Sequence, residues 1–192
     1  MTGDKKTVIY SRNTIEFVTV ATEFCAYLEG AEGKLRKEFV DTVLKLLPLL
    51  YLKASMLERI ESDTDFLPEA FVTEQDYEFL RLTLSGVMAT EDDYLDLCNE
   101  AVRFDDEPMV KNISEDLADI YQALKNFVET YRLGLEDNMY EATAEIAQSF
   151  SMYWGQTLTN AMRALHRVKY SFSDEDDECF SDDEYGSYEG NL

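Results

Sequence analysis

The sequence predicts an all-α fold: an up-and-down bundle of five to six helices followed by a disordered acidic C-terminal tail. Apolar residues recur at steps of three and four along most of the chain, as they do on one face of a helix. No alternation typical of strands has a useful length, and the composition turns acidic from Ser171 onward. We therefore expect one helical domain over residues 11–170 and a low-complexity tail over residues 171–192.

The first two helices are predicted over residues 13–28 and about 34–61. Asn13 is the expected N-cap of the first and Gly30 its stop, and apolar side chains cover most of its circumference, as in a central helix of a bundle. The second has a clear apolar seam: Val40, Val43, Leu47, Leu50, Ala54 and Leu57. Pro48 lacks an N–H, so we expect a kink or a break there.

The third helix opens at Thr73 with a capping box in which Asp76 replaces the usual Glu or Gln. Its expected seam is Tyr77, Leu80, Leu84 and Val87. The following segment, TEDDYLDLCNEAV (90–102), is predicted to form a short helix, and RFDDEP (103–108) a loop.

The last two helices have the clearest patterns. One begins at a Ser114 cap, with Asp116 at the positive end of the helix dipole, and ends at Gly134. The other is predicted to run unbroken over residues 138–169. Its expected core stripe is Tyr140, Ala144, Ala147, Ser151, Trp154, Leu158, Ala161, Leu165 and Val168. Arg163 and Arg167 fall on a solvent-facing stripe.

The single Trp and the single His lie on this last helix but do not form a pair. Helical geometry places Trp154 and His166 about 120° apart around the axis. A structural role is predicted for Trp154 and for Gly155, whose missing side chain lets another backbone pack close. His166 stays a functional candidate because histidine is the natural titrating side chain near neutral pH.

Composition restricts the chemistry that the chain can perform. The net charge of −23 repels nucleic-acid backbones and anionic membranes, which leaves another protein, basic or helical, as the expected partner. A single histidine does not complete the usual di-iron or zinc sites, so no metal or cofactor is predicted. The weak catalytic candidates are Asp116, Asp119 and His166; the two acids are better explained as first-turn acids that complement the helix dipole.

The three cysteines are predicted to be free thiols in a reducing compartment, and the two in apolar patterns, Cys25 and Cys98, to pack as small hydrophobes. No signal-peptide pattern or long apolar run occurs, so the expected location is cytoplasmic. We expect a non-enzymatic protein-interaction module. The alternatives are an enzyme with a carboxylate and histidine pocket, and an acidic decoy for basic proteins.

Two segments resemble a bacterial family known as a domain of unknown function, number 5063, common in the Bacteroides group. They are DLADIYQALK (116–125) and YWGQTLTNAMRALH (153–166). The matching residues are Asp119, Ile120, Tyr121, Leu124, Trp154, Gly155, Ala164, Leu165 and His166. The resemblance implies a bacterial, cytoplasmic, helical protein and supplies no activity. Family members often carry histidines beside the Trp-Gly pair, where this chain has Tyr153 and Thr157, which puts any metal role of those histidines in doubt here.

Overall fold

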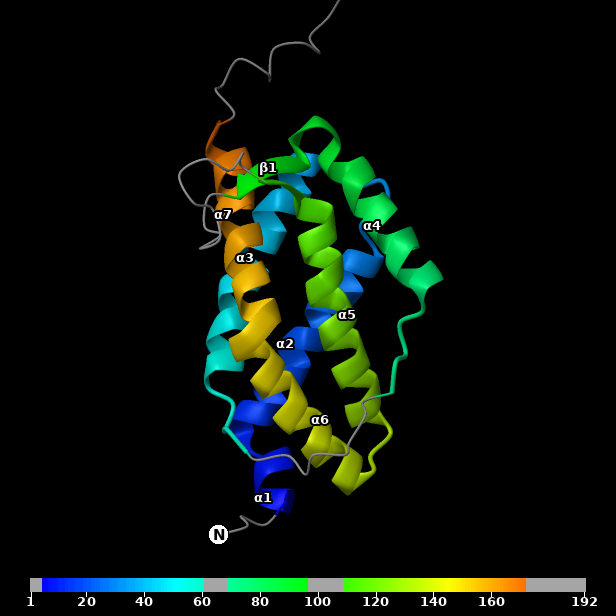
Figure 1. The fold of residues 1–192 in the computed structure, drawn as a ribbon, viewed down its shortest axis with the longest axis vertical. Helices are drawn as coiled ribbons and strands as arrows, with labels where there is room; N and C mark the ends of the chain where they lie inside the picture. The colour runs from blue at the N-terminus through cyan, green and yellow to red at the C-terminus, as the bar shows by residue number, and fades with distance from the viewer. Residues whose placement is uncertain (1–4, 61–68, 97–108, 172–192) are drawn as a thin grey trace, which may run out of the picture.

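Four long helices form a closed ring around the core of the computed structural model, which describes residues 5–60, 69–96 and 109–171. They are α2 (Arg12–Glu29), α3 (Arg36–Ser55), α5 (Ile113–Arg132) and α7 (Gly155–Ser171), and α2 contacts α3, α3 contacts α7, α7 contacts α5 and α5 contacts α2. The predicted all-α bundle is confirmed (Figure 1).

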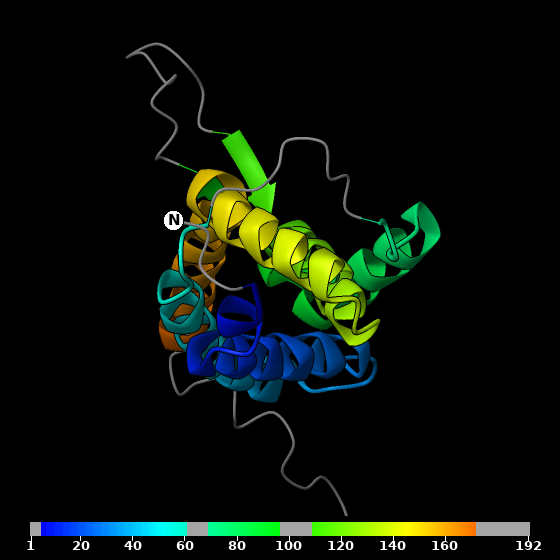
Figure 2. The ribbon, with the colours of Figure 1, turned by 90° about the horizontal axis from the view of Figure 1, so that it is seen from below.

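The remaining helices pack on this ring. Helix α4 (Glu74–Met88) lies against α5 at the side of the bundle, as Figure 2 shows from below. Helix α6 (Glu136–Ser149) contacts α5 and the short helix α1 (Lys5–Ile9), which the sequence did not predict. In the described ranges no helix is both long and apolar enough to cross a membrane.

The predicted seam of α3 is buried along its whole length, but the predicted break at Pro48 does not occur. All six seam residues are at most 7% exposed. A proline inside a helix costs about 3 kcal/mol. Each fully buried aliphatic side chain contributes about 1.5–3 kcal/mol, so burial on both sides of exposed Pro48 keeps the helix continuous.

Two predicted helix caps are confirmed, and the predicted N-cap of α2 is wrong. Gly30 is the C-cap of α2, and the capping box of Thr73 and Asp76 opens α4. Helix α2 begins two residues earlier than predicted, because the side chain of Ser11 accepts a hydrogen bond from the backbone N–H of Thr14. Asn13 instead donates to the carbonyl of Met56.

In the described part of residues 90–102, the first strand of a β-hairpin lies where a short helix was predicted. A 3₁₀ turn, η1 (Ala89–Glu91), leads into β1 (Asp93–Asp96), which pairs antiparallel with β2 (Met109–Asn112), with Tyr94 opposite Lys111. The prediction was wrong because four residues are too few to display the alternation of a strand, while Tyr94 is buried and Leu95 exposed. The predicted loop 103–108 lies outside the described residues.

The predicted unbroken helix over residues 138–169 is interrupted by a π-helical turn, η2 (Phe150–Trp154), between α6 and α7. The predicted core stripe holds from Trp154 onward. Before it, Ser151 is exposed, and the buried face of α6 is Met139, Ala142, Thr143, Ala144 and Ile146. The wider turn takes up an extra residue and brings two differently phased faces onto one core.

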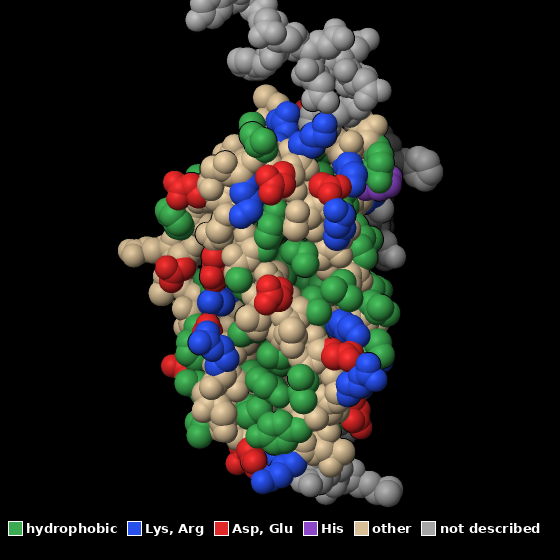
Figure 3. Space-filling view, turned by 180° about the vertical axis from the view of Figure 1, so that it is seen from behind, with side chains coloured by type: hydrophobic (Ala, Val, Ile, Leu, Met, Phe, Trp, Pro, Cys, Tyr) green, Lys and Arg blue, Asp and Glu red, His purple; other side chains and the backbone are tan. Residues whose placement is uncertain are grey.

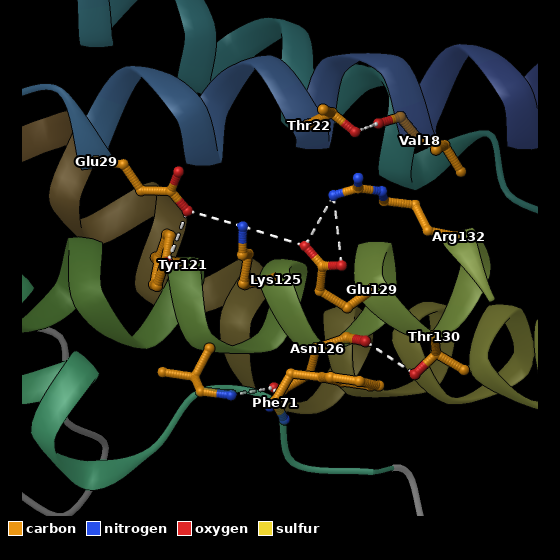
Figure 4. A network of polar contacts seen from close by, with 11 residues as sticks. Val18, Thr22, Glu29, Phe71, Tyr121, Lys125, Asn126, Glu129, Thr130 and Arg132 are labelled. Carbon is orange, nitrogen blue, oxygen red and sulfur yellow. Dashed lines mark hydrogen bonds and ion pairs between the residues drawn. The ribbon is translucent and has the colours of Figure 1, made fainter.

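A polar network on the outside of α5 fixes its neighbours (Figure 4). The ammonium of Lys125 lies 2.9 Å from a carboxylate oxygen of Glu29 on α2 and 3.2 Å from one of Glu129. The side-chain oxygen of Asn126 accepts the backbone N–H groups of Phe71 and Val72 at 2.8 and 3.0 Å, which holds the segment before α4.

The thiol of Cys25 is buried in the core, and burial raises its pKa to about 12. A thiol with so high a pKa is scarcely ionised near neutral pH and is a poor nucleophile, so Cys25 contributes packing. Cys98 and Cys179 lie outside the described residues.

Candidate functional site

The three predicted catalytic candidates have separate surroundings. Asp116 is 5% exposed and accepts a hydrogen bond of 2.5 Å from the hydroxyl of Tyr94. Asp119 accepts one of 2.7 Å from Tyr77 on α4, at the surface. The ring of His166 packs on Tyr170, with centroids 4.6 Å apart. Across the described ranges, no hydrogen bond or ion pair joins His166 to either aspartate.

The surroundings of Asp116 make it an anchor for the hairpin. Burial raises the pKa of its carboxyl to about 6, against the opposing effects of the Tyr94 hydrogen bond and the charge of Lys111. The neighbouring charges of Asp119 and Glu115 raise this pKa further. Because Tyr94 belongs to β1, its hydrogen bond to the Asp116 carboxylate ties β1 to the first turn of α5.

Asp92 joins the same two elements, and it corrects the predicted role of Ser114. Ser114 lies inside the first turn of α5 and does not cap it. Its backbone N–H and its hydroxyl donate to the two carboxylate oxygens of Asp92 at 2.8 and 2.7 Å. The backbone carbonyl of Asp92 accepts the N–H of Ile113, so a residue distant in sequence caps this helix.

A concave surface made of two hollows lies between α3 and α7, and we call it the α3–α7 groove. Its upper hollow, of about 570 Å³, is lined by Leu44, Lys45, Pro48, Thr159, Met162, Arg163, His166, Lys169 and Tyr170. Its lower hollow, of about 380 Å³, has a wall from α3 that includes Tyr51, Ala54 and Ser55, and an opposite wall that includes Phe150, Gly155 and Thr159. Thr159 lines both hollows, so the two adjoin along α7.

The π-helical turn shapes the lower hollow. The indole N–H of buried Trp154 donates to the carbonyl of Ile146 at 3.2 Å, and the ring of Phe150 packs on those of Trp154 and Tyr51 at 4.6 and 5.1 Å. A Cβ at Gly155 would lie 2.4 Å from the carbonyl oxygen of Phe150. A close approach does occur at Gly155, but the predicted partner, another backbone, is replaced by Phe150 of the same π-helical turn. Such π-turns often occur at functional sites.

The upper hollow carries positive charge in a chain of net charge −23. Helix α7 contains Arg163, Arg167 and Lys169 and no acidic residue. The guanidinium of Arg163 donates to the carbonyl oxygen of Leu95 at 3.4 Å, and that of Arg167 to the carbonyl oxygen of Asp93 at 3.5 Å, so the hairpin orients both arginines. Arg163 is exposed, as its place on the solvent-facing stripe predicted. A cationic rim was not predicted from the sequence, although the absence of acids along this helix could have indicated one.

One acid tempers this charge. Asp41 on α3 lies between Lys45, at 2.5 Å, and Lys169, and these hydrogen bonds lower the pKa of its carboxyl to about 2. Figure 3 shows Lys and Arg side chains gathered toward the end of the bundle where α7 finishes, with acidic side chains between them. The upper hollow thus has an apolar floor with a cationic rim.

A second exposed apolar surface lies on α4. Phe79 and Leu82 are 68% and 59% exposed and line a hollow of about 530 Å³ with the connection between α2 and α3. It is a single hollow, whereas the α3–α7 groove joins two and includes the Trp-Gly turn. Within the part of the chain that the structure describes, no group of three or more His, Cys, Asp or Glu side chains is arranged to hold a metal ion.

The fold and the groove define the class: a helical bundle with an external groove at a π-helical turn. The chain belongs to the family described as Domain of unknown function (DUF5063), whose model matches residues 8–171. It is similar to the crystal structure of protein BF1032 from Bacteroides fragilis, with 53% identity and a TM-score of 0.76 over 85% of this chain and 99% of that one. No curated protein matches it.

Proposed function

We propose that this protein is a protein-interaction module that binds an acidic segment with apolar side chains from another protein in the α3–α7 groove. The observation that carries the proposal is the junction of the two hollows at Thr159, which gives an aromatic lower end and a cationic upper end.

The groove offers two kinds of contact to such a segment. Tyr51 and Phe150 in the lower hollow offer apolar area, and aromatic residues are enriched where proteins bind each other. Arg163, Lys45 and Lys169 on the upper rim offer donors to carboxylates. A helix or an extended strand of a partner fits a groove between two helices.

The overall negative charge does not decide the partner at this site. Charges separated by more than about 8 Å are largely screened at physiological salt. A bound segment therefore interacts chiefly with the cations of the rim, although the charge of the whole chain favours a basic partner elsewhere on the surface.

The structure gives less support to an enzyme. The carboxylate of Asp116 is buried under the hairpin, Asp119 is bonded to Tyr77, and His166 lines a different surface. A shared acid–base pocket requires these groups within hydrogen-bond reach of one substrate.

A random 16-residue peptide library displayed on phage tests the proposal, with the full chain as bait. We expect enriched peptides that combine acidic and apolar residues, and at least a tenfold loss of their affinity for the Lys45→Glu/Arg163→Glu chain. Arg81→Glu, which reverses a cation on α4 far from the groove, serves as the matched control and should bind as the wild type does.

Enriched peptides that bind the Lys45→Glu/Arg163→Glu chain as tightly as the Arg81→Glu control would overturn the proposal, since binding would then not involve the groove. Failure to enrich any peptide, on the wild-type chain and on a chain whose tail acids are neutralised, would overturn it as well.

A further inference from the structure

We propose that the chain's own acidic tail, residues 172–192, binds in the upper hollow of the α3–α7 groove and competes there with the partner segment. This inference rests on the proposed function of the groove, and it names a regulator of that same site. The tail is the occupant because of where it leaves the bundle, how far it reaches and what charge it carries.

The tail begins at the wall of the hollow. Helix α7 ends at Ser171, and the two residues before it, Lys169 and Tyr170, line the upper hollow. The wall from Thr159 to Lys169 is helical, so it extends over about 15 Å at 1.5 Å per residue. Five extended residues cover that length at about 3.3–3.6 Å each, and the tail is much longer.

The chemistry of the tail matches that of the hollow. Residues 172–192 contain nine acids and no Lys or Arg, with Phe172, Phe180, Tyr185 and Tyr188 among them. The hollow presents Lys45, Arg163 and Lys169 around Leu44 and Met162. Carboxylates meet the cationic rim and aromatic rings meet the apolar floor.

Tethering makes even a weak match effective. A segment joined by a short flexible linker has an effective concentration in the millimolar range at a neighbouring site. If the free tail binds with a dissociation constant near 0.1 mM, about nine-tenths of the hollows are occupied at 1 mM. A partner then binds about tenfold more weakly than to an empty groove.

The test compares the full wild-type chain with a full chain in which the nine tail acids are changed to Asn and Gln. These substitutions touch no residue of the packed bundle. We expect different amide chemical shifts for residues around the upper hollow, such as Lys45, Thr159 and His166, and unchanged shifts around Phe79 on α4. We also expect a library-selected peptide to bind the neutralised chain about five- to tenfold more tightly.

A control chain carrying Glu23→Gln, Glu32→Gln and Glu74→Gln, all exposed positions outside the groove, measures the effect of net charge alone. It should show wild-type groove shifts and wild-type peptide affinity. A gain in affinity per neutralised acid equal to that of the tail variant would overturn the proposal.

The outcomes separate this inference from the proposed function. Identical groove shifts and equal peptide affinities in the wild-type and tail-neutralised chains overturn the tail proposal and leave the groove as a binding site. Groove shifts that change between these two chains, with no peptide bound by either, support the tail and overturn the partner function. Shift changes confined to another surface overturn the tail proposal.

Discussion

At the scale of single residues, Gly155 and Asp116 show how far the sequence predicts the candidate site. The Trp-Gly pair indicated a close approach, because glycine is the residue that allows one, and the structure finds it within the π-helical turn. Asp116 was visible as a first-turn acid. Its burial under Tyr94 was not, because that contact depends on the hairpin, which the pattern did not reveal.

Changing Gly155 to Ala is expected to destabilise the protein by about 1–3 kcal/mol, because the added methyl overlaps the carbonyl and ring of Phe150. Gly86→Ala, within α4, is the matched control, since a Cβ there meets nothing within 4 Å. It should stabilise the protein by about 0.5–1 kcal/mol. Urea unfolding measures both; equal stability of Gly155→Ala and wild type would contradict the assigned packing.

Asp116 predicts a specific dependence of stability on pH. Its folded pKa of about 6 exceeds the ordinary 3.8, so the unfolded chain loses this proton first as the pH rises. Its contribution to stability is therefore fully present below pH 4 and is lost as the pH passes through about 6. One unit of pKa corresponds to about 1.4 kcal/mol, so the loss amounts to about 2–3 kcal/mol.

The Asp116→Asn variant removes this titration while keeping an oxygen for Tyr94. Relative to wild type, its free energy of unfolding should rise by about 2–3 kcal/mol between pH 4 and pH 7. Urea unfolding at several pH values gives the difference directly. Parallel pH profiles for the two chains would show that the Asp116 carboxyl is not perturbed by burial.

At the scale of elements, the long helices were predictable and the junctions between them were not. Periodicity reveals α3 because five residues on one face are buried together, although the helix ends at Ser55, before the predicted residue 61. The π-helical turn adds one residue within a pattern that looks regular, so Ser151 was expected in the core and is exposed. The cap of α5 comes from Asp92, whose distance along the chain hides it from any local motif.

Replacing Asp92 with Ala is expected to cost about 2–4 kcal/mol, since the N–H and hydroxyl of fully buried Ser114 would lose their acceptors. The hairpin amides should also exchange faster with solvent, because β1 loses its link to α5. Asp93→Ala, at the neighbouring position, removes only an exposed hydrogen bond from Asn112 and should cost less than about 1 kcal/mol. Similar losses from both variants would rule out a specific role for Asp92.

At the scale of the whole molecule, charge is distributed unevenly in a way that composition does not reveal. The net charge of −23 indicated a basic partner. That sum hides α7, whose charged side chains are all Lys or Arg. The groove could not be predicted from the sequence, because it depends on the packing of α3 beside α7. No local pattern indicates which two helices of a ring leave a hollow between them.

The net charge also predicts how salt affects stability. Like charges destabilise a compact chain, and salt screens them, so the melting temperature at pH 7 should rise by several degrees between 0.05 and 0.5 M NaCl. Near the isoelectric point of about 4.2 the rise should be absent. A melting temperature that falls with salt at pH 7 would mean that ion pairs outweigh the repulsion.

The most direct test of the α3–α7 groove as a binding surface is a chemical-shift map of the full chain with a library-selected peptide. We predict that the largest amide shifts fall on both walls, at Tyr51 and Lys45 on α3 and at Thr159 and His166 on the other side. Shifts centred on Phe79 and Leu82 of α4, with the groove amides unmoved, would contradict the account.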